Sequence, residues 1–90
     1  MLFVALGRVR SGTTKERVAR RIEWKHPAGM RPIAEYWLQG DPAVISVVEA
    51  DSIGPIMAAV AAWDDVLHWT VLPAVTAEEG MKLVKAMMQK

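Results

Sequence analysis

The sequence predicts an α+β domain with a four-stranded antiparallel sheet, and three observations lead to that prediction. Four short apolar stretches alternate with two segments of helical spacing, which gives the order β-α-β-β-α-β. Right-handed crossovers and hairpin pairing then place the strands in the order 4-1-3-2. Pro32 and Pro73 fall in the two predicted edge strands, where a missing amide donor costs no ladder hydrogen bond. The pattern is that of a ferredoxin-like fold with an added C-terminal helix.

The composition indicates one small domain, residues 1–90, with a small hydrophobic core. The chain has 52% hydrophobic residues, a net charge of +1 and no cysteine, which excludes disulfides, cysteine metal sites and thiol nucleophiles. A monomer of this size buries only about two-thirds of its unfolded surface. No apolar run approaches the ~20 residues that cross a bilayer, and the N-terminus lacks the basic region of a signal peptide. We therefore expect a cytoplasmic protein that gains stability by self-association.

The first part of the chain predicts a strand and a helix. Leu2–Arg8 is a short apolar run that ends in glycine and charge, as a strand buried on both faces does. Thr13 and Glu16 form a capping box, so a helix begins near Thr14. The helix ends by about Lys25, before Pro27 and Gly29. Its apolar positions recur at helical spacing: Val18, Ile22 and Ala19.

A hairpin and a second helix follow. Pro32–Gln39 and Ala43–Ala50 are predicted strands, and Gly40-Asp41-Pro42 reverses the chain between them. Asp51 or Ser52 caps the second helix, whose apolar stripe continues to the acidic turn. The two strands are therefore expected to pair as neighbours.

The fourth strand lies within Trp63–Thr76 and is apolar on both faces. Leu67, Trp69 and Val71 point to one side because side chains alternate along a strand. The other side carries Val66, His68, Thr70 and Leu72. A strand of this kind needs cover on both faces.

A further capping box, Thr76 with Glu79, opens a terminal helix. One side of this helix is formed by Met81, Val84 and Met88. Methionine is typical both of core filling and of surfaces that dock on a neighbouring subunit.

The uncovered face of the sheet predicts a second copy of the chain. Both connecting helices cross on one face in this topology, yet the strands carry apolar side chains on both faces. An exposed apolar patch of that extent marks an interaction surface. We expect a homodimer or a higher homo-oligomer, in which two bare faces stack about 10 Å apart and close a barrel. The alternative is a monomer whose terminal helix folds back.

Three stretches carry a resemblance to a known family. Val48–Asp51 ends a strand before a helix, Trp63–Asp65 leads into a strand, and Leu72–Thr76 ends that strand. With the strand order, they resemble the dimeric α/β-barrel superfamily, and more narrowly a small-protein branch catalogued as a domain of unknown function. Relatives in the superfamily include cofactor-independent monooxygenases, haem-using enzymes, small-ring isomerases and amino-acid-sensing domains. The resemblance implies a pocket and leaves its use open.

Polar side chains within the apolar barrel are the candidates for chemistry. On parity, Glu35 and Trp37 share a face of one strand, and His68 and Thr70 share a face of another. A histidine beside a buried carboxylate can act as a general base, so the catalytic candidates are His68, Glu35 and Glu49. The ligand-binding candidates are Trp37, Trp69, Ser46, Thr70 and Phe3. The alternative assigns His68 to an interface hydrogen bond and the two glutamates to edge solubility or salt bridges.

The four tryptophans either line an aromatic pocket or anchor the core and an interface: Trp24, Trp37, Trp63 and Trp69. His26, His68 and scattered carboxylates form no metal-spaced cluster, and a lone histidine is weak evidence for haem, so we expect no metal and no cofactor.

Basic residues concentrate before residue 32, but the near-neutral charge and the missing base-stacking signature argue against nucleic acid. A solvated helix face, or pairing with acidic residues of a partner subunit, explains them better.

Two functions remain open from the sequence. The first is a homo-oligomeric barrel that binds a small, mostly apolar ligand, as a cofactor-independent enzyme of monooxygenase or isomerase type or as a binding protein. The second is a non-catalytic regulatory or interaction module whose barrel is filled by side chains. A cavity distinguishes the two, because only the first hypothesis requires one.

Overall fold

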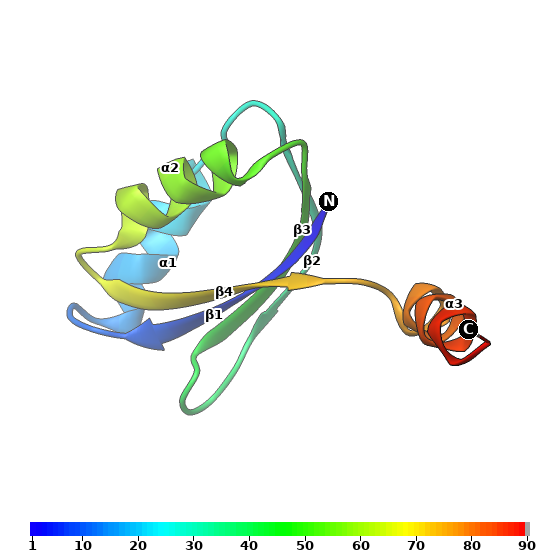
Figure 1. Ribbon diagram of the computed structural model, residues 1–90. Helices are drawn as coiled ribbons and strands as arrows, with labels where there is room; N and C mark the ends of the chain where they lie inside the picture. Colours follow the sequence, from blue (N-terminus) through cyan, green and yellow to red (C-terminus); the bar gives the residue numbers. More distant parts are fainter. Residues whose placement is uncertain (90) are drawn as a thin grey trace.

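Four strands form one antiparallel sheet, and two of the three helices cover a single face of it. The computed structural model describes residues 1–89. Its elements are β1 (Leu2–Val9), α1 (Thr14–Glu23), β2 (Met30–Trp37), β3 (Val44–Ala50), α2 (Ile53–Trp63), β4 (Leu67–Ala74) and α3 (Ala77–Met88). The strands lie in the order β2-β3-β1-β4, which confirms the ferredoxin-like topology and the predicted order. Both α1 and α2 lie on the same face (Figure 1).

Side-chain caps start the helices at the predicted places. Thr13 Oγ1 accepts a hydrogen bond from the Glu16 amide at 3.1 Å, and the Glu16 carboxylate accepts one from the Thr13 amide at 3.3 Å. These bonds satisfy two of the donors that a first helical turn leaves free. Ser52, rather than Asp51, caps α2, and Thr76 caps α3.

The edge strand β2 departs most from the sequence prediction. It begins at Met30 and ends at Trp37, two residues earlier at each end than expected. A register shift between Pro32 and Ala34 forms a bulge, and Ile33 at that point is 60% exposed. The bulge is accommodated at an edge because only one neighbour, β3, has to follow it. Both strand prolines, Pro32 and Pro73, lie in edge strands as predicted.

We call the helix-covered face of the sheet the closed face and the opposite one the open face. The buried core lies on the closed face and consists of Phe3, Val48, Ala50 and Ile56, with Trp63 and Leu67 at one end. The open face carries the alternate side chains: Leu2, Val4 and Leu6 of β1, Ile45 and Val47 of β3, Ala34 and Tyr36 of β2, and Leu72 of β4. No helix in residues 1–89 covers it (Figure 1). The sheet is therefore apolar on both faces and buried on one.

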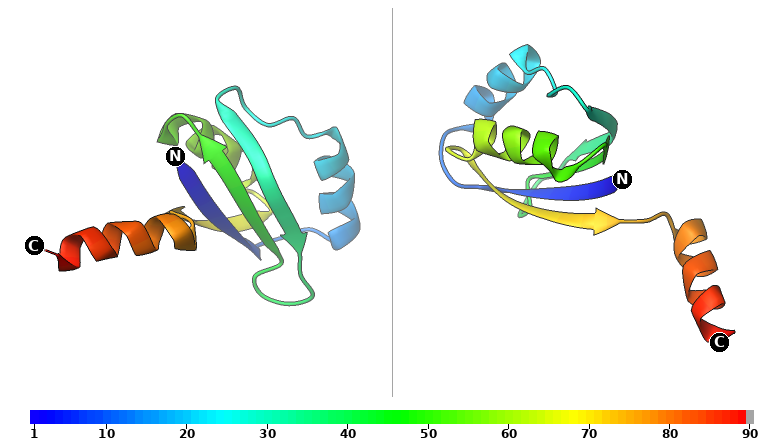
Figure 2. Two further views of the ribbon diagram at one scale, coloured as in Figure 1. Left: turned by 90° about the vertical axis from the view of Figure 1, so that its right-hand side faces the viewer. Right: turned by 45° about the horizontal axis from the view of Figure 1, so that its top comes forward.

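The terminal helix projects away from the remainder of the molecule. α3 leaves the end of β4 and lies apart from both other helices (Figure 2), which gives the chain extents of 52 × 29 × 17 Å. None of the helices in residues 1–89 combines the length and the hydropathy that a bilayer crossing requires.

Candidate functional site

The closed face holds a pocket between the sheet and the two helices that cover it. Its cavity measures about 270 Å³, and all four tryptophans line it. Apolar side chains such as Phe3, Val48 and Ile56 form most of the remaining wall. An engineered cavity of about 150 Å³ already holds benzene, so this one has room for roughly ten non-hydrogen atoms. This pocket lies under the helices of one chain. The interior that two stacked open faces would enclose is a different space, so both sequence hypotheses about the barrel stay predictions.

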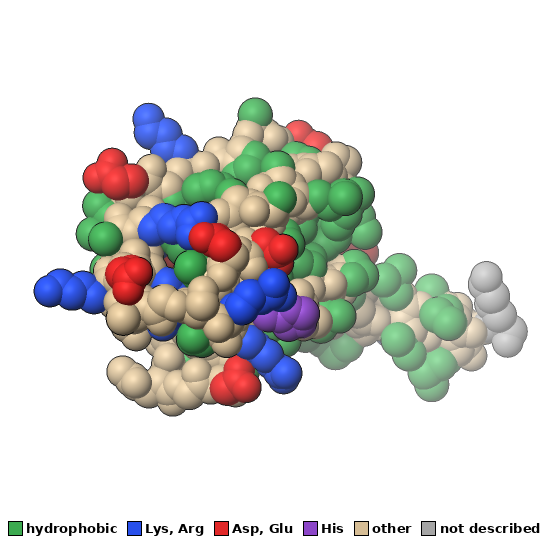
Figure 3. All heavy atoms as spheres, turned by 90° about the vertical axis from the view of Figure 1, so that its left-hand side faces the viewer, with side chains coloured by type: hydrophobic (Ala, Val, Ile, Leu, Met, Phe, Trp, Pro, Cys, Tyr) green, Lys and Arg blue, Asp and Glu red, His purple; other side chains and the backbone are tan. Residues whose placement is uncertain are grey.

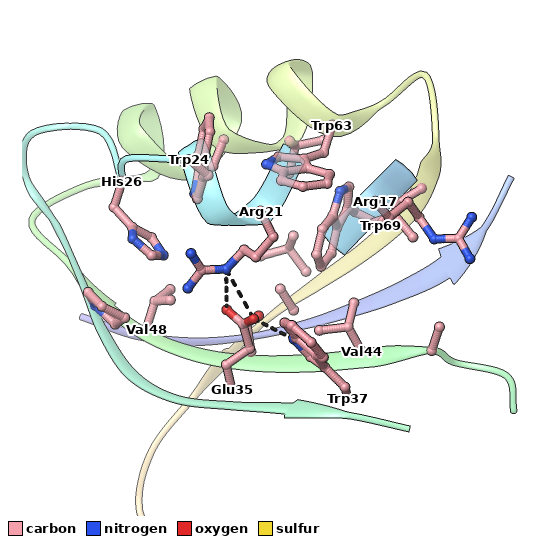
Figure 4. Close-up of a pocket in the computed structure, with 18 of the residues that line it drawn as sticks. Arg17, Arg21, Trp24, His26, Glu35, Trp37, Val44, Val48, Trp63 and Trp69 are labelled. Atoms are coloured by element: carbon pink, nitrogen blue, oxygen red, sulfur yellow. Dashed lines mark hydrogen bonds and ion pairs between the residues drawn. The ribbon is translucent and has the colours of Figure 1, made fainter. Parts of the chain in front are cut away.

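A charged and hydrogen-bonded cluster stands on one side of this pocket. Arg21 Nε donates to both oxygens of Glu35, at 3.2 and 3.1 Å. Trp37 Nε1 donates to Glu35 Oε2 at 2.7 Å. The terminal nitrogens of Arg21 point away from Glu35, toward the side of the pocket where His26 lies (Figure 4). Four N–H donors of a guanidinium therefore face a mostly apolar space.

The spacing of α1 explains why an arginine enters the pocket. Arg17, Val18, Arg21 and Trp24 recur at three- and four-residue intervals, and all four line the cavity. Ile22, which the sequence pattern placed on the apolar side of this helix, is 73% exposed. The expected stripe is thus rotated, because the helix turns its Arg21 side toward the carboxylate that β2 presents. The helix also ends at Glu23, and Trp24 is already extended.

The pKa values of the two titratable groups beside Arg21 are displaced. Burial raises the pKa of Glu35, but hydrogen bonds from Arg21 and Trp37 and the charge of Arg21 outweigh it, so the pKa lies below its usual value. Burial and then the charge of Arg21 lower the pKa of His26, and Glu35 offsets part of this. At neutral pH the pocket therefore contains a carboxylate, a guanidinium and a neutral imidazole that can donate and accept.

Aromatic contacts hold one wall of the pocket in place. The rings of Trp24 and Trp63 meet edge to face, with their centroids 5.9 Å apart. The Arg20 guanidinium lies 5.0 Å from the centroid of the Trp63 ring, while its Nη1 donates to Asp65 at 3.0 Å. These contacts tie α1 to the end of α2 and fix the width of the pocket.

Trp69 owes its position to a glycine on the neighbouring strand. Gly7 pairs with both Val44 and Trp69, and a Cβ on it would lie 2.6 Å from Val44 Cγ1 and 3.0 Å from Trp69 Cζ3. Only glycine leaves room for these two side chains to close over β1. The buried indole N–H of Trp69 has no hydrogen-bond partner among residues 1–89. It is a donor that an acceptor entering this wall would satisfy.

The structure divides the candidates predicted from sequence between the two faces of the sheet. Five of them line the pocket: Glu35, Trp37, Trp69, Ser46 and Phe3. Three lie on the open face: His68, Thr70 and Glu49.

Two of the open-face candidates, His68 and Glu49, have partners of their own. His68 Nδ1 lies 3.1 Å from Arg10 Nη2, and the N-terminal ammonium bonds Glu49. His68 therefore does not meet Glu35, and the histidine beside Glu35 is His26. Sequence reasoning weighed His26 only as a metal ligand and did not single out Arg21. The signal for Arg21 was its three-residue spacing from Val18 and Trp24.

Charged side chains gather at one end of the molecule, where β1 leads into α1 and α2 leads into β4 (Figure 3). Arg10 approaches Asp64 at 3.9 Å, and Arg20 pairs with Asp65 at 3.0 Å. Several of the early basic residues are thus paired within the chain, whereas the sequence suggested a solvated face or a partner's acidic residues. In the described part of the chain, no three His, Asp or Glu side chains are placed to share a metal ion.

Comparison with known proteins identifies the family. The model of a domain of unknown function (DUF3303) matches residues 1–88. No curated protein and no solved structure gives a significant match. The expected relation to a domain of unknown function is confirmed, while the relation to the dimeric α/β-barrel superfamily stays a prediction. Because the match covers nearly the whole chain, this protein belongs to the DUF3303 family.

Proposed function

We propose that this protein binds a small, mostly apolar molecule with a hydrogen-bond acceptor, in the pocket of the closed face, and that it works as a homo-oligomer. One observation carries the first part: Arg21, Glu35 and His26 converge in a single apolar cavity of about 270 Å³. The two groups with displaced pKa values among residues 1–89 are Glu35 and His26, and both line it. Apolar pockets with a few converging polar groups and perturbed titratable residues are typical ligand sites.

The side chains that line the pocket define the chemical class of the proposed ligand. Aromatic rings fit a flat hydrocarbon body, and the cavity limits that body to one or two rings. Glu35 is already satisfied by Arg21 and Trp37, whereas the outer edge of the Arg21 guanidinium is open to the pocket. The ligand group at this point is therefore an acceptor, such as a carbonyl or carboxylate oxygen.

The test is a series of ligands that share one ring. Benzoate, benzyl alcohol and toluene carry a charged acceptor, a neutral acceptor and none. All four tryptophans line the pocket, so intrinsic fluorescence reports binding directly. We expect saturable binding of benzoate with a Kd of about 1 mM or tighter, weaker binding of benzyl alcohol and weakest binding of toluene.

Two adjacent alanines of α2 supply the matched control. Ala59 lines the cavity, and Ala58 is exposed and does not. Ala59→Leu should fill the space and weaken benzoate binding at least tenfold, while Ala58→Leu should leave it unchanged. Equal affinity in the two variants, or no saturation by any compound in the series, would exclude this pocket as the site.

For the catalytic hypothesis, the pocket offers one pair of acid–base groups, His26 and Glu35. Of the three candidates from sequence, only Glu35 stands in the pocket. His26, neutral because its pKa is lowered, is the group there that can take up a proton. The cofactor-independent enzyme therefore remains a second function, which His26 and Glu35 would serve.

The proposal of a homo-oligomer is based on the exposed apolar side chains of the open face. Leu72 and Tyr36 on this face are 49% and 60% exposed, and the apolar residues of β1 and β3 beside them are only half-buried. Apolar surface of this extent is characteristic of contacts between subunits. A second copy that presents the same face would cover it across a two-fold axis.

A further inference from the structure

We infer that α3 is an exchanged arm: in the homo-oligomer, the apolar side of α3 from each copy lies on the body of the other copy. This inference rests on the proposed association through the open face and adds to it the segment that completes the contact. Three observations carry it, namely the side-chain pattern of α3, the junction that precedes it and the surface area of the chain.

The side chains of α3 are sorted into an apolar and a polar side, and the large residues of the apolar side are exposed. At 3.6 residues per turn, one arc of the helix holds only apolar residues and glycine. Its members are Ala77, Gly80, Met81, Leu83, Val84, Met87 and Met88. The large ones are 50–79% exposed, from Leu83 to Met88. Figure 3 shows hydrophobic side chains over this projecting helix.

The junction between β4 and α3 directs the helix away from its own sheet. Only Val75 and Thr76 separate the two elements. Thr76 Oγ1 accepts from the Glu79 amide at 3.1 Å, and a Cβ on Gly80 would lie 3.5 Å from Val75 Cγ2. The cap fixes where the helix begins, and beyond it α3 extends away from the sheet of its own chain (Figure 2). The large apolar side chains of the arc therefore stay exposed in the single chain.

The surface area of the chain has the size that a dimer requires. Its accessible surface is 6367 Å², whereas a compact monomer of 10.0 kDa exposes about 5,200 Å². The excess is about 1,100 Å², and a stable dimer buries about 800 Å² on each partner. The extra surface of this elongated chain is thus comparable with the area that one partner of a stable dimer buries.

A second copy fits this surface better than a membrane does. Helices that lie on membranes carry an excess of lysine and arginine on the polar face. The polar side of α3 is balanced, with Glu78 and Glu79 against Lys82 and Lys85. A second copy, in contrast, presents both an apolar sheet face and an apolar helix. Across a two-fold axis, the α3 of each copy then contacts the body of the other.

The experiment measures mass and contact separately, so that failure of the arm and failure of the oligomer can be told apart. Light scattering should give a mass of at least twice the 10.0 kDa of one chain. Because the chain contains no cysteine, a single Met87→Cys variant carries one spin label at the end of α3. Mixed with an equal amount of ¹⁵N-labelled, spin-free protein, it should broaden amide signals on the body of the other copy.

Two α3 variants with the same charge change provide the control. Val84→Glu alters the apolar arc and should weaken self-association at least tenfold, whereas Ala86→Glu, on the polar side, should leave it unchanged. An oligomer with neither intermolecular broadening nor a difference between the variants would overturn the exchanged arm and leave the open-face contact standing. A single chain at submillimolar concentration would overturn both, and binding of that single chain to phospholipid vesicles would assign α3 to a membrane surface instead.

Discussion

The two faces of the sheet are built from the same four strands, but their apolar side chains are covered on one face and exposed on the other. On the closed face, α1 and α2 cover the strands, and a charged cluster is retained beside a cavity. On the open face, side chains of similar hydrophobicity have no cover within residues 1–89. The difference teaches that hydrophobic content alone does not locate the functional site, since both faces are apolar. The proposed site lies where a partly buried ion pair is held, and the open face is where we propose that a second chain binds.

Neighbouring valines of β3 test this comparison with the largest effect. Val48 is 2% exposed on the closed face, and Val47 is half-buried on the open face. Val48→Ala should lower the free energy of unfolding by about 2 kcal/mol, since it removes buried methyl groups and leaves a cavity. Val47→Ala should cost less than about 1 kcal/mol in dilute solution, and more at concentrations where the open face is covered. Urea unfolding at two protein concentrations measures both.

A Val47→Ala loss that is the same at both protein concentrations would show that the open face is not covered by a second chain. Equal losses that are both large in dilute solution would show instead that the two faces do not differ in burial.

The ion pair of the closed face gives the next largest effect. Arg21→Met should lower the free energy of unfolding by about 1–2 kcal/mol, because it leaves the carboxylate of Glu35 partly buried without its cation. Glu35→Gln in the same chain should recover part of the loss. Arg31→Met removes the exposed pair with Asp51 and should cost less than about 0.5 kcal/mol. A double-mutant cycle measures the coupling between Arg21 and Glu35.

If Arg21→Met lowers the free energy of unfolding no more than Arg31→Met does, the pair of Arg21 and Glu35 contributes no more than an exposed surface pair. The pocket would then have no polar anchor, and the proposed recognition of an acceptor group would lose its basis.

The fold could be predicted from sequence because its rules are local or pairwise. A capping box marks the start of α1, a threonine cap marks the start of α3, and the prolines of β2 and β4 mark the edges. Strand parity correctly placed Glu35 beside Trp37 and His68 beside Thr70. It could not show that a bulge at Pro32 and Ala34 shifts the pattern of β2, so that Met30 and Glu35 both line the pocket.

The site was harder to predict because it depends on which partner a side chain meets. The rotation of α1 is decided by the pairing of Arg21 with a carboxylate on another element, and the apolar pattern pointed to Ile22 instead. His26 belongs to neither a helix nor a strand, so no period fixes its direction. Only the folded chain shows that His26 lines the same pocket as Arg21 and Glu35.

The caps of α1 and α3 offer a smaller test of the same contrast. Both helices begin with a threonine whose hydroxyl accepts from the amide three residues on, at 3.1 Å in each case. Thr13→Ala should cost about 1 kcal/mol of stability, because α1 packs on the sheet and unfolds with it. Thr76→Ala should leave the stability of a dilute, single chain unchanged and reduce only the helicity of α3, measured by circular dichroism. If both variants cost the same in dilute solution, α3 is packed on its own body.

The pH dependence of stability gives the smallest expected effect. The folded chain holds the pKa of His26 below its usual value of 6.5, so the unfolded chain binds more protons as the pH falls past that value. Stability is then fully present above about pH 6.5 and declines as the pH falls toward the lowered pKa. Glu35 adds a loss of the same sign only below its usual value of 4.5. Thermal unfolding from about pH 7.5 to about pH 5 isolates the histidine.

Two histidine variants, one for each face, complete this test. His26→Gln removes the titrating group of the pocket and should flatten the decline in Tm over this range. His68→Gln changes the exposed histidine of the open face, which bonds only Arg10 among residues 1–89, and should retain most of the decline. A decline that survives His26→Gln unchanged would mean that His26 is as hydrated in the folded chain as in the unfolded one. The pocket would then be wetter than its apolar wall indicates, and the ligand that it favours would be more polar than one aromatic ring with a single acceptor.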